Sequence, residues 1–270
     1  MLTDAQIDRW LDEDLGHHDV TNDLPGTATG RLVATEAGTV AGVDAARRVF
    51  ERLDCAVDTH VDAGDRVDAG ATLCEASGPT RAVLRAERVA VNLAGHASGI
   101  ATATAAICRA VEAVDPSVTV AGTRKTTPGL RGIEKRAIAA GGGDTHRLGS
   151  SHAVMIKDNH VAAFGLEDAI ERFRERASFT TPIEVEVETV ADAERAAALG
   201  VDIVLLDNMD PATVERAVER IGGDGAPIVE ASGAITRETA PDYAATGVDV
   251  CSVGALTHSA PALDLSFRLA

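Results

Sequence analysis

The chain has 270 residues, of which 45% are hydrophobic and only 3% aromatic. This length is enough for one large domain or for a large domain with a smaller companion, and the hydrophobic content argues against global disorder. No apolar run approaches the roughly 20 residues that a membrane span requires. The N-terminal segment is acidic and amphipathic, unlike a signal peptide. The sequence therefore predicts a soluble cytoplasmic protein.

The chain is strongly acidic, with 42 acidic residues, 25 basic residues and a formal net charge of -17. This charge would repel a phosphate backbone, so we expect no nucleic-acid partner. An acidic, lysine-poor surface suits a salt-rich cytoplasm, which leads to the hypothesis of a halophilic source. The few lysines retained are then expected to serve a function that needs a compact ammonium group: Lys125, Lys135 and Lys157.

The cysteines are scattered, with no CxxC pair and no histidine at ligand spacing. We therefore expect free thiols rather than disulfides or a structural zinc site. They are Cys55, Cys74, Cys108 and Cys251.

The first hundred residues predict a domain of helices packed on an antiparallel sheet. Residues 3–15 have the pattern of a short amphipathic helix, and residues 44–54 predict a second helix. Residues 31–42 and 61–79 have the pattern of strands joined by Gly and Asp turns.

The pattern changes after residue 85. Residues 85–114 are Ala-rich and free of Pro, which predicts a long helix that could break between Gly95 and Gly99. Six short apolar runs then end in polar or small residues: VTVAGTRK, AVMIKDN, IEVEVE, DIVLLDN, PIVEASG and VDVCSVG. Helical stretches separate several of them, at 166–177, 190–200 and 211–222. Strands that alternate with helices predict a parallel sheet, and the six charged endings favour a closed α/β barrel with its site at the C-terminal strand ends.

Two cations follow the first of these strands. Arg124 and Lys125 leave the strand end together, and Pro128-Gly129 then forces a turn. Arg binds carboxylate or phosphate through a bidentate fork, and Lys does so as a point charge. A solvated basic loop is the alternative.

The segment 141–160 carries a second group of candidate residues. Three glycines at 141–143 permit unusual dihedral angles or close approach of a ligand. His146 and Arg147 add a donor and another anion clamp. Lys157 ends an apolar strand, so we expect its stem to be buried in the barrel, where a lysine without an anionic partner is costly.

Acidic residues end two further strands. Alternation places Glu184, Glu186 and Glu188 on one face of the strand, and Asp207 follows an apolar run. These carboxylates could hold Mg²⁺ or ribose hydroxyls, or they could neutralise the nearby cations as structural pairs. Both interpretations remain open from the residues alone.

The last two strands end in Ser232-Gly233 and in a segment from Gly254 to His258. Late loops of a parallel barrel, with exposed backbone N–H groups, are a common place for a phosphate.

The order and spacing of TRKTTPGLR, GGGDTHRLGSSHAVMIKDNH, EVEVET, LLDN, EASGAIT and VGALTHS resemble the quinolinate phosphoribosyltransferase family. EDLGHHDVT and ERVAVNLAGHASGIATAT resemble the family's opening segment and long helix, so the resemblance covers essentially the whole chain. The pair His17-His18 departs from the family pattern.

The resemblance implies an N-terminal α/β sandwich domain over residues 1–100, with the tail 259–270 packed on it. It implies an α/β barrel with fewer than eight regular strands over residues 101–258. It also implies an obligate homodimer in which Arg88 is lent across the interface to the partner's substrate. The implied reaction is decarboxylating phosphoribosyl transfer from 5-phosphoribosyl 1-diphosphate to quinolinate, giving nicotinate mononucleotide, CO₂ and pyrophosphate for NAD synthesis.

The resemblance also assigns roles to residues near the base. Arg124, His146 and Arg147 match the family's clamps on the pyridine dicarboxylate. Lys125 and Lys157 match the lysines that lie between the base and the phosphoribosyl donor.

On the donor side, Glu186 and Asp207 match the acidic pair that contacts ribose and Mg²⁺. Four residues match the positions that hold the donor's 5′-phosphate: Ser232, Gly233, Gly254 and His258.

Three alternatives remain. A paralogue could use another base such as nicotinate, although two arginines and His146 converging on the base favour a dicarboxylate. Lys157 could be a Schiff-base lysine in an aldolase-like barrel. A binding or scaffold protein would have no need of so complete a set of charged strand ends.

Overall fold

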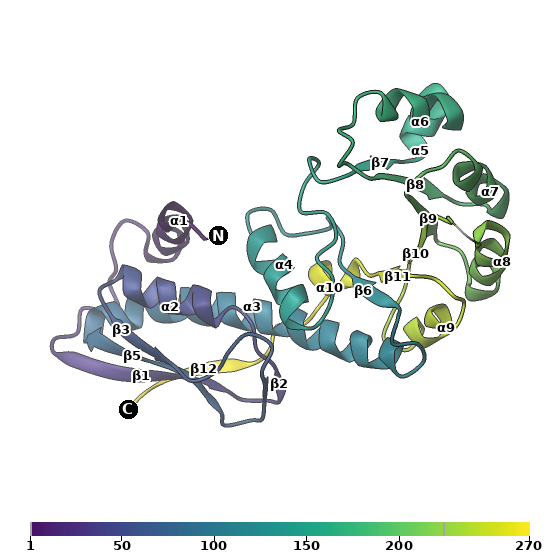
Figure 1. The fold of residues 1–270 in the computed structure, drawn as a ribbon. Helices are drawn as coiled ribbons and strands as arrows, with labels where there is room; N and C mark the ends of the chain where they lie inside the picture. The colour runs from purple at the N-terminus through teal and green to yellow at the C-terminus, as the bar shows by residue number, and fades with distance from the viewer. Residues whose placement is uncertain (1, 224) are drawn as a thin grey trace. The chain divides into compact units, whose positions relative to one another are not determined.

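A computed structural model of the chain describes residues 2–223 and 225–270. The chain divides into two compact units (Figure 1). The N-terminal unit comprises the residues up to Ala105, Thr126–Gly142 and Ser259–Ala270, and the C-terminal unit comprises Ala106–Lys125 and Gly143–His258. These units are defined by packing, and the limits 1–100 and 101–258 stay a prediction about domains.

Two helices of the N-terminal unit form where their pattern predicts them. Helix α1 (Asp4–Leu15) begins at Thr3, whose hydroxyl accepts from the backbone N–H of Gln6 while the Gln6 side chain accepts from the Thr3 N–H. This capping box satisfies two N–H groups that the helix cannot bond internally. Helix α2 (Val43–Arg52) buries one apolar face.

A four-stranded antiparallel sheet supports these helices in the order β12-β1-β5-β3. The strands are β1 (Thr27–Ala34), β3 (Ala56–Thr59), β5 (Thr72–Pro79) and β12 (Leu265–Leu269). Strand β12 pairs with β1, so the last residues of the chain form one edge of the sheet. Strands β2 (Gly38–Thr39) and β4 (Arg66–Val67) form a separate two-stranded ladder.

The long helix α3 (Thr80–Glu112) is continuous, so the predicted break at Gly95 and Gly99 is wrong. These glycines are contact points instead. A Cβ on Gly99 would lie 2.0 Å from the carbonyl oxygen of Pro261, and one on Gly95 would lie 3.0 Å from that of Leu263. The missing side chains let the C-terminal tail lie directly on the helix. Helix α4 (Arg131–Ala140) also belongs to this unit.

The C-terminal unit contains a six-stranded parallel sheet in the order β6-β11-β10-β9-β8-β7. All six predicted strands are present: β6 (Thr119–Ala121), β7 (Val154–Ile156), β8 (Ile183–Val187), β9 (Ile203–Asp207), β10 (Ile228–Ser232) and β11 (Val250–Ser252). Within the described residues, no ladder joins the end strands β6 and β7, and Ala121 bridges to Asp144 instead. The expectation of an α/β barrel with fewer than eight regular strands is confirmed.

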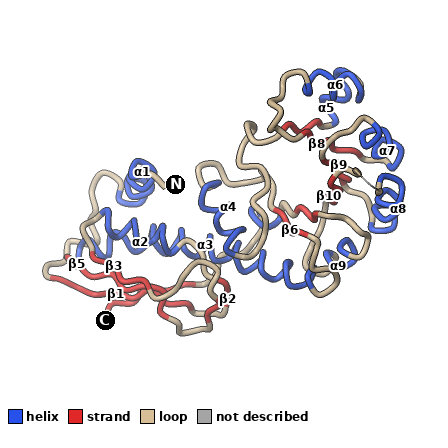
Figure 2. Tube along the Cα trace, viewed as in Figure 1, coloured by secondary structure: helices blue, strands red, loops and turns tan. Residues whose placement is uncertain are grey.

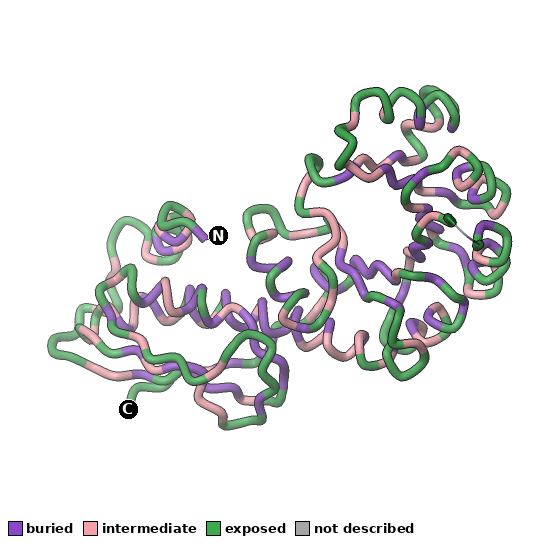
Figure 3. The backbone as a smooth tube through the Cα atoms, viewed as in Figure 1, coloured by how far each residue is buried: buried purple, intermediate pink, exposed green. Residues whose placement is uncertain are grey.

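Helices surround this curved sheet (Figure 2). The three predicted helices correspond to α6 (Leu166–Arg174), α7 (Val190–Ala198) and α8 (Pro211–Ile221), and three short helices were not predicted: α5 (Asp158–Phe164), α9 (Ala240–Ala244) and α10 (Ala255–His258). Buried residues follow the strands, and exposed residues follow the outer sides of the helices (Figure 3). Parallel strands covered by helices bury both faces, which is why their sequences are nearly continuous apolar runs.

The four cysteines are free thiols, as expected, and Cys108 is the least buried of them. In the described part of the chain, every helix is too short or too polar to cross a membrane. The cytoplasmic location stays a prediction.

Candidate active site

A cavity of about 410 Å³ opens at the C-terminal ends of the barrel strands. Its lining combines cations, carboxylates and small polar residues from the ends of all six strands. Nine of the twelve residues expected in the site line this cavity: Arg124, Lys125, His146, Arg147, Lys157, Glu186, Asp207, Ser232 and Gly233. Segments that are far apart in the sequence therefore meet because parallel strands end at the same edge.

The first two cations stand on a loop held by hydrogen bonds. The backbone N–H of Lys125 donates to the Thr123 hydroxyl at 3.0 Å, and the Thr257 hydroxyl donates to the Lys125 carbonyl at 2.7 Å. These contacts fix the backbone just after β6, so Arg124 and Lys125 leave it in set directions.

Lys157, just after β7, forms a hydrogen-bonded ion pair with Glu186 on the neighbouring strand β8. Its side chain is 44% exposed, so the expectation of a buried lysine is wrong. The difference arises because β7 ends at Ile156 and Lys157 already occupies the N-cap of α5, at the mouth of the barrel rather than inside it. A half-exposed ammonium group can interact with an anion that enters the cavity.

Arg147 lies deeper, with a side chain that is 11% exposed. Its Nη2 donates to the Met155 Sδ at 2.7 Å, and its Nε lies 3.9 Å from the Glu184 Oε2. Burial lowers the pKa of Arg147, although the guanidinium stays charged because its ordinary pKa is far above neutrality. The side chain is thus a desolvated cation backed by a buried carboxylate.

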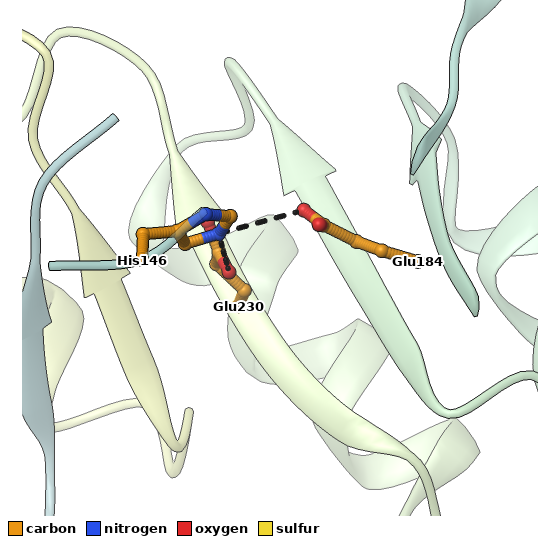
Figure 4. Close-up of side chains that lie close together, drawn as sticks. All are labelled: His146, Glu184 and Glu230. Carbon is orange, nitrogen blue, oxygen red and sulfur yellow. Dashed lines mark hydrogen bonds and ion pairs between the residues drawn. The ribbon is translucent and has the colours of Figure 1, made fainter. Parts of the chain in front are cut away.

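The side chains of His146, Glu184 and Glu230 lie close together (Figure 4). The His146 Nε2 lies 3.1 Å from the Glu230 Oε2 and 3.8 Å from the Glu184 Oε1. Burial, and then the negative charge of Glu230, raises the pKa of Glu184 to about 7. Burial lowers the pKa of His146, but the two carboxylates outweigh burial and raise it above its ordinary value.

Glu230 was not among the predicted residues, and Glu184 was named only as one of three carboxylates on its strand face, without a role of its own. Both are fully enclosed, with 0% and 3% of their surface exposed. A signal for each exists in the sequence. Glu184 shares a strand face with Glu186, and Glu230 is the one acid within the apolar run IVEA. A lone carboxylate in a buried strand is costly unless it has a polar partner, so its presence indicates a partner.

Asp207, Ser232 and Gly233 form one edge of the cavity. Ser232 is in register with Asp207 on the neighbouring strand. The Asn208 side chain donates to the Asp207 Oδ2 at 2.7 Å, and the Asn208 N–H donates to the Ser232 carbonyl at 2.9 Å. Gly233 has φ 140, and a Cβ there would lie 2.9 Å from the Asn208 Oδ1. Only glycine fits this conformation and this space.

The remaining three candidates lie elsewhere. Of the described residues, neither Gly254 nor His258 lines the cavity, but a Cβ on Gly254 would lie 3.0 Å from the Lys125 Cδ and 3.5 Å from the His258 Nε2. Both are therefore close neighbours of a lining residue. Arg88 lies on α3 in the N-terminal unit, where its side chain is 61% exposed and 3.7 Å from Glu87. The histidines that depart from the family pattern, His17 and His18, are exposed, and the structure offers no account of them.

Known proteins are similar to this chain in both sequence and fold. The sequence-family model for the N-terminal domain of quinolinate phosphoribosyl transferase matches residues 18–98, and the family model for the C-terminal domain matches residues 100–268. A Methanothermobacter thermautotrophicus protein named "Probable nicotinate-nucleotide pyrophosphorylase (carboxylating)" is 42% identical over 264 residues, which cover 95% of both chains. The human nicotinate-nucleotide pyrophosphorylase (carboxylating) is 38% identical over 98% of this chain and 91% of its own.

Among solved structures, NadC from Streptococcus pyogenes superposes with a TM-score of 0.93 at 40% identity, covering 100% of this chain and 98% of its own. The two family models together cover residues 18–98 and 100–268, and the structural match covers the whole chain. The chain belongs to the quinolinate phosphoribosyl transferase family.

Proposed function

We propose that this protein transfers the phosphoribosyl group of 5-phosphoribosyl 1-diphosphate to quinolinate and decarboxylates it, giving nicotinate mononucleotide, CO₂ and pyrophosphate for NAD biosynthesis. One observation carries the proposal: a protein of net charge -17 concentrates Arg124, Lys125, Arg147 and Lys157 in a single cavity together with Glu186 and Asp207. Both substrates are polyanions, and only a local excess of cations lets such an acidic protein bind them. Membership of the family supports the same reaction.

The two kinds of cation in the cavity suit the two substrates. Arg124 and Arg147 can hold the carboxylates of the base through bidentate hydrogen bonds. Lys125 and Lys157 supply point charges for the diphosphate of the donor. Binding both substrates in this way orients the pyridine nitrogen toward C1′ and replaces an encounter in solution by a fixed geometry.

The transfer needs no nucleophile from the protein. The pyridine nitrogen forms a bond to C1′ as the C1′–oxygen bond breaks, and the electron pair leaves with pyrophosphate. Positive charge develops on the ribose in between, and the carboxylates of Glu186 and Asp207 stabilise it. The lysines stabilise the opposite charge on the leaving group.

The product of transfer carries a cationic ring nitrogen, which can accept electrons. The carboxylate on C2 then leaves as CO₂, its bonding pair stays on C2, and C2 takes a proton. We assign the arginines an orienting role in this step.

We extend the proposal to Mg²⁺, held by Glu186 and Asp207 together with the donor's phosphates. The chemistry of the ligand set fits, because Mg²⁺ is usually bound by one or two carboxylates plus substrate phosphate. Each carboxylate already uses one oxygen, Glu186 for Lys157 and Asp207 for Asn208, and each has a second oxygen. The ion would neutralise charge on the diphosphate.

We also propose a homodimer in which Arg88 serves the partner's site. Support comes from its 61% exposed side chain and from two exposed apolar side chains in the same unit, Val20 at 82% and Leu24 at 50%. Co-expression of Arg88→Ala with Lys157→Ala tests this. Random pairing gives mixed dimers in which one site is intact, so about a quarter of wild-type activity should return. No recovery in verified mixed dimers would contradict the shared site.

The reaction itself is tested by supplying the donor with quinolinate labelled in its C2 carboxylate or with nicotinate. We expect labelled CO₂ and nicotinate mononucleotide in equal amounts from quinolinate, and slow turnover of nicotinate. Faster turnover of nicotinate would assign the protein to the paralogous activity. Borohydride trapping of Lys157 with a carbonyl substrate would instead indicate an aldolase-like enzyme.

A further inference from the structure

The buried group formed by His146, Glu184 and Glu230 has the composition of a metal site. Its potential ligand atoms all lie within 4.8 Å of one another (Figure 4). The hydrogen bonds of the histidine ring decide what the group can do, because each ring nitrogen is either a donor or an acceptor.

The Nδ1 of His146 is an acceptor. It receives the backbone N–H of Arg147 at 2.7 Å, and a backbone amide can only donate. The proton of the neutral ring therefore resides on Nε2, which points at the Glu230 Oε2 at 3.1 Å. A metal ion bound to Nε2 would need the opposite tautomer, in which Nδ1–H donates to a neighbouring acceptor. The three side chains are thus arranged to hold Arg147 through hydrogen bonds, and not to bind a metal ion.

The chain of hydrogen bonds from Glu230 through His146 leads to Arg147. His146 itself has φ 51, a conformation held by donation from its own N–H to the Asp144 Oδ1 at 2.6 Å. Its ring then fixes the Arg147 N–H, while Met155 and Glu184 hold the guanidinium. The backbone and the side chain of this arginine are therefore both anchored from below the cavity.

We propose that Glu230 is a positioning residue for substrate binding: it holds His146 in the Nε2–H tautomer, and through that ring it directs Arg147 at a carboxylate of the base. Both ring nitrogens of His146 are engaged, Nδ1 with the Arg147 N–H and Nε2 with Glu230, so the ring offers no donor to the substrate. The proposal rests on the proposed function for the identity of the base.

The tautomer is tested on the enzyme without substrate, by ¹⁵N NMR of histidine-labelled protein at mildly alkaline pH. Comparison with the spectrum of a His146→Asn variant assigns the signals. We expect the Nε2–H tautomer in the wild type and in Glu230→Gln, whose amide oxygen still accepts, and a mixture of tautomers in Glu230→Leu. A wild-type ring with its proton on Nδ1, or a cationic ring, would overturn the proposal.

Kinetics test the link to Arg147. Glu230→Leu should raise the KM for quinolinate at least about tenfold, the size of one hydrogen bond to a charged group, while Glu230→Gln recovers most of the loss. The KM for the phosphoribosyl donor should stay unchanged in both. An unchanged quinolinate KM in a folded Glu230→Leu variant would show that Glu230 does not act on the base.

Two substitutions of His146 distinguish a residue that holds Arg147 from one that contacts quinolinate directly. Asn places an acceptor near the position of Nδ1, and Gln places a donor near that of Nε2. If the ring serves Arg147, Gln should raise the quinolinate KM more than Asn does. The reverse order would make His146 a direct ligand of the substrate. If the wild-type enzyme does not turn over quinolinate at all, the proposed function fails, and the NMR result still decides the tautomer and the role of Glu230 in fixing it.

Discussion

The contact between α3 and the C-terminal tail predicts a large penalty for one methyl group. In Gly99→Ala, the new Cβ would lie 2.0 Å from the Pro261 carbonyl oxygen and 2.8 Å from the Ala262 Cα. Both of these atoms belong to backbone, so the tail must move away by more than an ångström. That shift would break the bond from the Leu263 N–H to the Gly95 carbonyl, now 3.0 Å, and would uncover Leu263, which is 5% exposed.

The sign of the net effect follows from two opposing terms. Alanine gains about 1 kcal/mol over glycine in a helix interior, whereas overpacking and the lost hydrogen bond together cost about 1.5–4.5 kcal/mol. We expect Gly99→Ala to lower the free energy of unfolding by about 1–3 kcal/mol, and the melting temperature by roughly 3–10 °C.

The assay is thermal unfolding followed by circular dichroism, with Gly132→Ala in α4 as the matched control. Nothing lies within 4 Å of a Cβ at position 132, so this second alanine should be neutral or slightly stabilising. If Gly99→Ala melts at or above the temperature of the control, the tail does not rest on α3 as described.

Three further predictions concern charge. The pKa of Glu184 is raised from an ordinary 4.5 to about 7 in the folded protein, so folding favours the protonated carboxyl group. The free energy of unfolding therefore falls as pH rises from 5 to 8. Glu184→Gln should remove up to about 3 kcal/mol of that fall, as measured by urea titrations at several pH values. The same slope in wild type and variant, with exposed Glu219→Gln as control, would contradict this. Lys157→Ala should lower kcat/KM by about 10²–10³ and leave the melting temperature within about 2 °C, because the Lys157 side chain is 44% exposed and its ion pair is screened by solvent; wild-type turnover would disprove its role. If the source is halophilic, KCl at molar concentration should raise the melting temperature by screening the net charge of -17; a protein most stable at low ionic strength would refute that hypothesis.

The barrel strands could be predicted from sequence because each combines an apolar run with a polar ending. Both features are local, so they need no knowledge of the fold. Parallel pairing then brings the endings together, as Ser232 and Asp207 illustrate. The cavity that gathers most of the candidate residues follows from this geometry.

The errors concern residues whose role depends on a distant partner. Gly99 has the sequence signature of a helix break, but its contact is Pro261 in the tail. Gly141 was expected to let a ligand approach, yet a Cβ there would lie 2.6 Å from the Ala101 carbonyl oxygen of α3. Glu230 went unnoticed because its partner, His146, lies on a different segment. Periodicity reports which face of an element is buried, and not what it is buried against.

The pairing of β12 with β1 also constrains how the protein is made. Leu269 lies opposite Gly30, so the first sheet stays incomplete until β12, which follows the whole barrel in sequence, has been synthesised. On the ribosome the N-terminal strands must therefore wait through translation of the entire barrel, with the edge of β1 exposed to pairing with other chains. A barrel that folds early would shorten the effective loop between the two ends and lower the entropic cost of closing it.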